Sequence, residues 1–297
     1  MLEELKTVID ESKIKINVSM AEYTTFKTGG NADVLIMPTT SEELKSVVNF
    51  FYETATQYYV LGNGSNLLVS DKGIRKPVIH LGKNFNSIEV FDNCITAKAG
   101  AYLSTIAKKA VDESLSGFEF AAGIPGTLGG ALIMNAGAYG GEMKDVVEAV
   151  SFIDITGKEY VVSGEEMEFE YRKSALSDTD CIITGATIKL ARGKREEISA
   201  KMAELAAKRR EKQPLEYPSA GSTFKRPQGH FAGALIESAG LKGKTVGGAQ
   251  VSEKHAGFII NKEKATTEDI CNLIEQVREE VYKKHGVTLE TEVKYWD

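Results

Sequence analysis

The chain has 297 residues, of which 42% are hydrophobic and 26% charged, a composition typical of a soluble globular protein. This length exceeds the usual size of one hydrophobic core, so we expect two or three domains. The formal net charge of −6 argues against nucleic acid or an anionic membrane as the main partner, because either would require a basic surface.

Cysteine and histidine spacing excludes two further classes of site. The three cysteines, Cys94, Cys181 and Cys271, are odd in number and far apart, which argues against a disulfide framework and fits a reducing cytoplasm. The four histidines are scattered without the spacing of metal ligands, so we expect no metal site. Residues 1–20 have neither the apolar core nor the cleavage site of a signal peptide, and we expect a cytoplasmic protein.

The first 61 residues alternate helix and strand. Apolar residues at helical spacing predict a surface helix over residues 2–9, and a strand follows over residues 32–37. Thr40 and Glu43 form the pattern of a capping box, which predicts the start of a second helix. We expect the next strand at residues 58–61.

A first glycine-rich turn, GNGSN at residues 62–66, follows this strand directly. Such a turn can hold a nucleotide phosphate, although Asn-Gly beside Ser is also ordinary turn chemistry. The Rossmann fingerprint requires a third glycine that opens a helix, whereas residues 67–69 look extended. A dinucleotide bound here would therefore lie on a different fold.

The pattern becomes rich in strands from residue 78 onward, which marks a second lobe. We predict strands over residues 78–81, 88–91 and 94–99, followed by a helix over residues 104–114.

Residues 121–141 carry no charge and hold seven glycines among small apolar side chains. Glycine lets the backbone approach another group closely, and successive amides can then form a concave anion site. A phosphate or diphosphate is the ligand that this arrangement favours. The alternatives are a flexible loop or a tight crossing of two backbones.

The second lobe continues with strands over residues 151–155, 159–162 and 181–190, and the charged helix over residues 194–212 leads into a third unit. In that unit Thr266 and Asp269 predict the start of a helix, and Gly286 its end. The C-terminal elements are predicted in this order: an irregular segment (213–227), a helix (231–239), a turn (247–248), a strand within 255–261, a helix (266–285) and a strand (287–296).

Four motifs, taken in this order, resemble the UDP-N-acetylenolpyruvoylglucosamine reductase family of flavoenzymes, which make UDP-N-acetylmuramate for bacterial peptidoglycan. The motifs are GNGSN at 62–66, GIPGTLGG at 123–130, YRKS at 171–174 and AGSTFK at 220–225. The resemblance covers almost the whole chain, and the spacing between the motifs resembles the shorter subtype of the family, which lacks a tyrosine-bearing lid.

The resemblance implies an α+β fold with a two-lobed FAD-binding region of the vanillyl-alcohol-oxidase type and a C-terminal substrate domain. The expected boundaries are 1–82 for the first lobe, 83–192 for the second and 193–297 for the substrate domain. Many proteins with this flavin fold attach the ring covalently through histidine or cysteine. Because Asn63 stands in the first turn here, we expect dissociable FAD.

The resemblance also implies which residues contact FAD, mainly through backbone amides. The expected FAD contacts are Gly62, Asn63, Gly64, Ser65, Asn66, Gly123, Pro125, Gly126, Thr127, Gly129, Gly130, Asn135, Gly137 and Ala138.

The implied reaction passes hydride from NADPH through FAD to the enolpyruvyl group of UDP-N-acetylglucosamine enolpyruvate. Arg172 would hold the substrate carboxylate, Ser222 would donate a proton to the neighbouring carbon, and Glu292 would lie near that carboxylate. The alternatives without a catalytic role are that Arg172 is a surface arginine, Ser222 a turn serine and Glu292 an exposed strand carboxylate. The expected substrate contacts are Lys225, Arg226, His255 and Lys294.

Two rival functions fit the same glycine loops. One is a sugar or alcohol oxidase that shares the flavin fold and uses oxygen. The other is a nucleotide-binding module without catalysis, which NADPH would not reduce.

Overall fold

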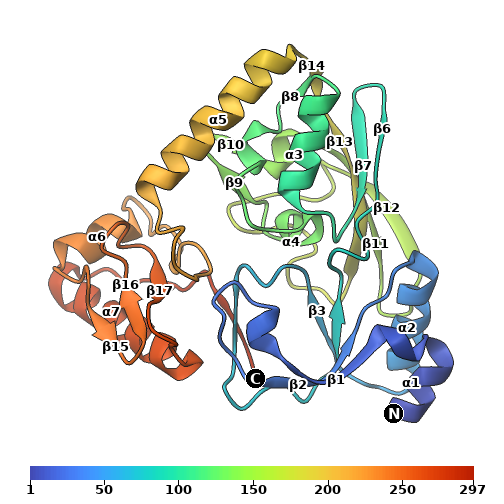
Figure 1. Ribbon diagram of the computed structural model, residues 1–297, viewed down its shortest axis with the longest axis horizontal. Coiled ribbons are helices and arrows are strands. Elements are labelled where there is room, and N and C mark those ends of the chain that lie inside the picture. The colour runs from blue at the N-terminus through green and yellow to red at the C-terminus, as the bar shows by residue number, and fades with distance from the viewer. The chain divides into compact units, whose positions relative to one another are not determined.

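The computed structural model covers residues 1–297, and contacts between residues divide the chain into two compact units (Figure 1). Each unit combines segments that are far apart in the sequence. The first unit consists of Met1–Lys15, Val34–Asn63 and Lys76–Arg209, and the second of Ile16–Asp33, Gly64–Arg75 and Arg210–Asp297. The predicted division at residues 82 and 192 stays a prediction.

A four-stranded sheet has the strand order β1, β2, β5, β3, in which β5 pairs in parallel with both β2 and β3. Its strands are β1 (Ile14–Ser19), β2 (Asn31–Ile36), β3 (Tyr59–Leu61) and β5 (Val78–His80). Helices α1 (Leu2–Val8) and α2 (Ser41–Glu53) pack together, and their apolar residues join the core around Ile36 and Ile79. Strand β1 was not predicted, although Ile14, Ile16 and Val18 alternate with polar residues; Ile16 is exposed, so this alternation does not mark a buried face.

A five-stranded antiparallel sheet lies in the first unit with the order β12, β11, β13, β7, β6. Its strands are β6 (Ile88–Phe91), β7 (Cys94–Lys98), β11 (Val147–Ile153), β12 (Glu159–Ser163) and β13 (Ile182–Lys189). Helices α3 (Leu103–Asp112) and α4 (Leu128–Ile133) cover one face of this sheet (Figure 1). Small residues such as Ala97 and Ala186 point to the covered face and admit the helices.

The remaining elements of the first unit are short, apart from α5 (Arg195–Lys212), which continues into the second unit. Two-residue strands pair as β8 (Leu115–Ser116) with β14 (Ala191–Arg192), and β9 (Gly137–Ala138) with β10 (Gly141–Glu142). In both units together, 3-10 turns lie at Glu11–Lys13, Met20–Glu22, Glu119–Ala121 and Met143–Asp145.

The second unit has its own core between α7 and a three-stranded antiparallel sheet. The elements are α6 (Ala232–Ser238), β15 (Thr245–Val246), β16 (Ala249–Val251), β17 (Ile259–Asn261) and α7 (Thr267–His285). In the same unit β4 (Leu67–Val69) pairs in parallel with β18 (Lys294–Trp296).

Local signals at α7 are confirmed. Thr266 and Asp269 form both bonds of a capping box, and Gly286 ends the helix in the left-handed conformation at φ 68°. The prediction of one regular strand over residues 287–296 is wrong. This segment changes partner along its length: Thr291 bridges Phe224, whereas only Lys294–Trp296 pairs with β4.

Candidate active site

Gly62 and Asn63, which begin the first glycine-rich loop, meet the second loop within the first unit. The Asn63 side-chain amide donates to the Pro125 carbonyl at 2.7 Å, which ties the start of the first loop to the second. A Cβ atom at Gly62 would collide with the Thr127 hydroxyl, so glycine is required there for the loops to touch.

The second loop holds backbone donors that the protein itself does not use. The N–H groups of Leu128 and Gly129 donate to backbone carbonyls just before α3, both at 2.8 Å. The N–H groups of Gly126, Thr127 and Gly130 have no acceptor within the chain. Of these three residues Thr127 is buried, Gly126 half-buried and Gly130 exposed. Three N–H groups without an acceptor on one glycine-rich loop fit an anionic group such as a diphosphate.

His80 supports the first loop, a role that the sequence did not indicate. Its ring fills the space over Gly82, where a Cβ atom would lie 2.6 Å from the imidazole, and its side chain hydrogen-bonds the Gly62 backbone. Burial lowers the pKa of His80, and this hydrogen bond opposes that effect. Histidine at the end of a short strand carries no local signal of such a contact.

Other glycines in the uncharged stretch are explained by packing. A Cβ atom at Gly137 would lie 2.8 Å from the Cβ of Glu142, and one at Gly141 would lie 2.7 Å from the Phe120 ring. A close crossing of chain segments therefore accounts for this end of the stretch, as the alternative interpretation proposed.

Arg172 lies in a two-residue turn of the first unit. Glu170 and Lys173 form a bridge across this turn, and Arg172 adopts the left-handed conformation at φ 58°. Its guanidinium lies 5.1 Å from the centre of the Tyr171 ring, and the residue is half-buried. A left-handed non-glycine residue costs free energy and is often found at functional sites.

Arg209, near the end of α5, is a second cation, and it is not among the site residues predicted from the sequence. Its side chain packs against Gly123, where a Cβ atom would lie 3.0 Å from Cδ of Arg209. Burial lowers the pKa of Arg209, and none of the ion pairs of the chain includes it. The charged pattern of α5 indicates a solvated face, so only the tertiary contact identifies this residue.

In the second unit, Ser222 and Glu292 lie on neighbouring backbone segments. The Glu292 N–H donates to the Thr223 carbonyl at 2.8 Å, and the Asn66 side-chain amide donates to the Glu292 carbonyl at 3.1 Å. The Ser222 hydroxyl makes no hydrogen bond within the protein and is available to a ligand. Asn66 thus also holds the segment that carries Glu292.

Most of the residues predicted to bind the substrate make contacts within the protein itself. Lys225 forms an exposed ion pair with Glu290 at 3.3 Å, and the Arg226 guanidinium lies 4.4 Å from the centre of the Phe231 ring. His255 accepts a hydrogen bond from the Gly257 N–H at 3.1 Å, and burial lowers its pKa.

The other predicted residues are placed as follows. Lys294 is exposed in β18, Gly64 has φ 59° and approaches the Tyr23 carbonyl closely, Ser65 is half-buried beside it, and Ala138 lies in β9.

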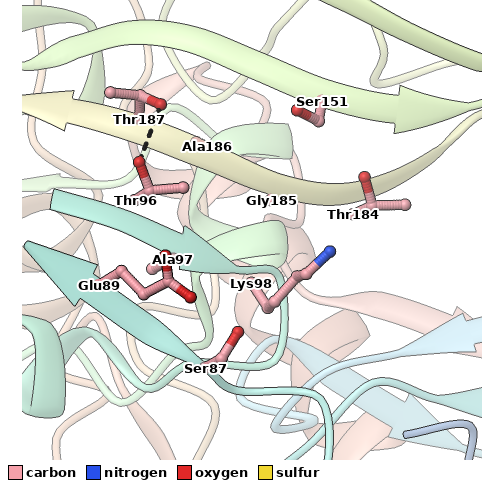
Figure 2. A pocket seen from close by; sticks show the side chains of 10 residues that line it. All are labelled: Ser87, Glu89, Thr96, Ala97, Lys98, Ser151, Thr184, Gly185, Ala186 and Thr187. Carbon is pink, nitrogen blue, oxygen red and sulfur yellow. Dashed lines mark hydrogen bonds between the residues drawn. The ribbon is translucent and has the colours of Figure 1, made fainter. Parts of the chain in front are cut away.

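A polar hollow of about 230 Å³ lies on the five-stranded sheet and includes none of the predicted site residues (Figure 2). Thr96 and Thr187 project from the face opposite the helices and share a hydrogen bond at 3.3 Å. Gly185, between Lys98 and Ser151 in the ladder, leaves the space open. Lys98 donates to the Ser41 hydroxyl at 2.7 Å.

Family comparisons identify the chain. Residues 213–296 match the C-terminal domain of UDP-N-acetylenolpyruvoylglucosamine reductase, and residues 32–163 match an FAD-binding domain. A reductase of that name from Clostridioides difficile is 50% identical over 290 residues, which covers 98% of this chain and 95% of the relative. The chain belongs to this reductase family.

Two further comparisons agree with this family. The reductase of Caldanaerobacter subterraneus is 52% identical and covers 99% of this chain and 97% of the relative. The crystal structure of the Thermus caldophilus reductase matches with a TM-score of 0.82 and 39% identity, over 96% of this chain and 98% of that one. A glucose dehydrogenase, Phl p 4.0202, matches at 17% identity and a TM-score of 0.52 over 64% of this chain and 44% of that one, which shows a shared fold alone.

The α+β fold and the FAD cofactor expected from the sequence are therefore confirmed, and the chain is an FAD-containing oxidoreductase. The unused amides of the second loop fit this cofactor. No group of histidine, cysteine and acidic side chains could hold a metal ion. No helix is long and apolar enough to cross a membrane.

Proposed function

We propose that this protein reduces UDP-N-acetylglucosamine enolpyruvate to UDP-N-acetylmuramate, with NADPH as the electron donor and dissociable FAD as the carrier. The reaction would take place in the cytoplasm and supply peptidoglycan synthesis. The observation that carries this proposal is similarity over nearly the full length to reductases of this name, joined to amides of the second glycine loop that have no acceptor in the protein.

The cofactor is held by both glycine loops in this proposal. Gly126, Thr127 and Gly130 would offer backbone N–H groups to the FAD diphosphate, and Arg209 adds positive charge beside the same loop. His80 would hold the first loop in place through Gly62. FAD, when bound, supplies the hydride exchange between NADPH and the enolpyruvyl carbon.

Three side chains complete the chemistry on the substrate. Negative charge grows on the substrate carboxylate as hydride arrives at the neighbouring double bond, and the fixed Arg172 guanidinium would stabilise it in a bidentate contact. Ser222 would donate a proton to the carbon that bears the carboxylate, since its hydroxyl has no other partner. Glu292 would lie beside that carboxylate, held by the backbone bond to Thr223.

The substrate diphosphate would be bound by cationic side chains and one imidazole of the second unit. Lys225, Arg226, His255 and Lys294 are the proposed contacts with phosphate or carboxylate groups. The exposed pair of Lys225 with Glu290 is worth little in water, so a phosphate can displace it.

A steady-state assay tests the proposal. The purified holoenzyme should consume NADPH only when the enolpyruvyl nucleotide sugar is present, and mass spectrometry should show a product heavier by two hydrogens. Rapid NADPH consumption with oxygen and no sugar would support the oxidase instead. Absence of FAD from the wild-type protein would refute the proposal altogether.

A further inference from the structure

Asn135 lies where the uncharged glycine-rich stretch leaves α4, and it is almost completely buried, with 1% of its surface exposed. Its backbone is left-handed at φ 40°, a conformation that asparagine tolerates better than most residues. A buried amide in this position must be hydrogen-bonded, because a buried polar group without a partner costs free energy.

The side-chain amide of Asn135 makes its hydrogen bonds to groups of the protein itself. Its nitrogen donates to the Glu142 carboxylate at 2.7 Å and to the Glu170 carbonyl at 3.1 Å. Its oxygen accepts from the Lys144 N–H at 3.0 Å. Both amide hydrogens are therefore used, and none is left for a ligand.

The bond to Glu170 matters because Glu170 opens the turn that carries Arg172. Across this turn the Lys173 N–H reaches the Glu170 carbonyl only at 3.4 Å, so Asn135 makes the shorter of the two bonds to that oxygen. A long side chain in the left-handed region persists only where its surroundings fix the backbone. Asn135 supplies such a constraint from outside the turn.

A second contact fastens the chain that follows the turn to the same helix. The Ser177 hydroxyl donates to the carbonyl of Ile133, the last residue of α4, at 2.8 Å, and it accepts from the Ser174 N–H at 2.8 Å. Helix α4 begins directly after Thr127 of the second glycine loop. The six-residue helix α4 thus connects the second glycine loop to the two hydrogen bonds, from Asn135 and Ser177, that hold the Arg172 segment.

We propose that Asn135 is a positioning residue for Arg172. Its amide fixes the Glu170 carbonyl, and through it the strained turn, at a set distance from the loop proposed to hold FAD. The inference rests on the role of Arg172 in the proposed function. It gives Asn135 a role in positioning Arg172, whereas the sequence led us to expect direct contact between Asn135 and FAD.

The test compares Asn135→Gly with the wild-type holoenzyme. Glycine keeps the left-handed backbone and removes only the amide. We expect FAD to remain bound and NADPH to reduce it at the wild-type rate. Product formation should fall by about 10- to 100-fold, with a higher KM for the enolpyruvyl sugar, because a small displacement of Arg172 misplaces the carboxylate. Asn93→Ala removes another side-chain bond to a backbone carbonyl in this unit and should have no such effect.

A double-mutant cycle separates this role from general damage. If Asn135 acts through Arg172, Asn135→Gly should cause no further loss in an Arg172→Ala background. The same loss in both backgrounds, or release of FAD by Asn135→Gly, would overturn the inference. Wild-type turnover in Asn135→Gly would overturn it while leaving the proposed function intact, whereas wild-type turnover in Arg172→Ala would refute the role of Arg172 itself.

Ser177→Ala keeps the inference testable if Asn135→Gly does not fold. This variant removes the bond to Ile133, the other tie between α4 and the Arg172 segment. We expect retained FAD and slower product formation, again without further loss in the Arg172→Ala background. Unchanged product formation would count against the proposed fastening of the turn.

Discussion

The proposed proton donor is the hydroxyl of Ser222, and hydrogen bonds of the next residue hold the backbone beside it. Ser222 is followed by Thr223, whose backbone bonds Gly257 and Glu292 and whose hydroxyl accepts from the Ile259 N–H. These bonds fix the backbone next to Ser222 while its own hydroxyl stays unpaired. A weak acid can still protonate a strongly basic carbon when it is held close to it.

Ser222→Ala should therefore separate the two halves of the reaction. We expect NADPH to reduce the flavin at the wild-type rate, while product formation falls by about 10²- to 10⁴-fold, the usual contribution of a positioned acid. Rapid-mixing absorbance measures both steps. Ser238→Ala, a serine of α6 that bonds within its own helix and to His285, is the matched control. Normal product formation in Ser222→Ala would remove this residue from the mechanism.

His80 predicts a pH dependence of stability. Burial holds its pKa below the ordinary value of 6.5, and the nearby charges of Lys15 and Lys83 act in the same direction. Below pH 6.5 the unfolded chain therefore binds a proton that the folded chain resists, so the free energy of unfolding should fall as the pH drops from 7 to 5. His255 contributes with the same sign.

Urea unfolding of His80→Gln at several pH values checks this effect. The variant should lose less stability between pH 7 and pH 5 than the wild type, because glutamine does not titrate. His230→Gln, at an exposed position, should follow the wild-type curve. An equally steep curve for His80→Gln would show that other groups cause the acid sensitivity.

At the level of elements, strong local sequence patterns were sufficient to predict a helix or strand. The stripe Leu44, Val47, Val48 and Phe51 is buried as the helical pattern of α2 predicted. Signals that depend on distant partners were not sufficient. The alternation over residues 287–296 is genuine at the buried Leu289 and Val293, but sequence cannot reveal that the segment changes partner between Phe224 and β4.

The cap of α7 gives a prediction about stability alone. Thr266→Ala removes one side of the capping box, which should lower the free energy of unfolding by about 1 kcal/mol. Flavin content and turnover of the folded protein should not change, since Thr266 touches none of the proposed site residues. Thr288→Ala, an exposed threonine beyond the helix, should cost much less in the same urea titration. Equal losses in the two variants would argue against the cap.

At the level of the whole molecule, the order of motifs was enough to predict the fold and the cofactor. It did not reveal which segments of the chain make up each of the two units. Parallel pairing of β4 with β18 brings residues 67–69 and 294–296 together across most of the chain. No local pattern specifies such a pairing. For the same reason His80, Arg209 and the contacts of Asn135 emerged only from the three-dimensional arrangement.

In the proposed reaction, bound FAD carries electrons from NADPH to an enolpyruvyl sugar nucleotide. An anaerobic absorbance experiment on the holoenzyme follows this transfer, with NADPH added first and UDP-N-acetylglucosamine enolpyruvate second. We expect the yellow flavin colour to disappear with NADPH and to return with the substrate. A flavin that stays bleached after the substrate is added, or that NADPH never bleaches, would refute the proposed reaction.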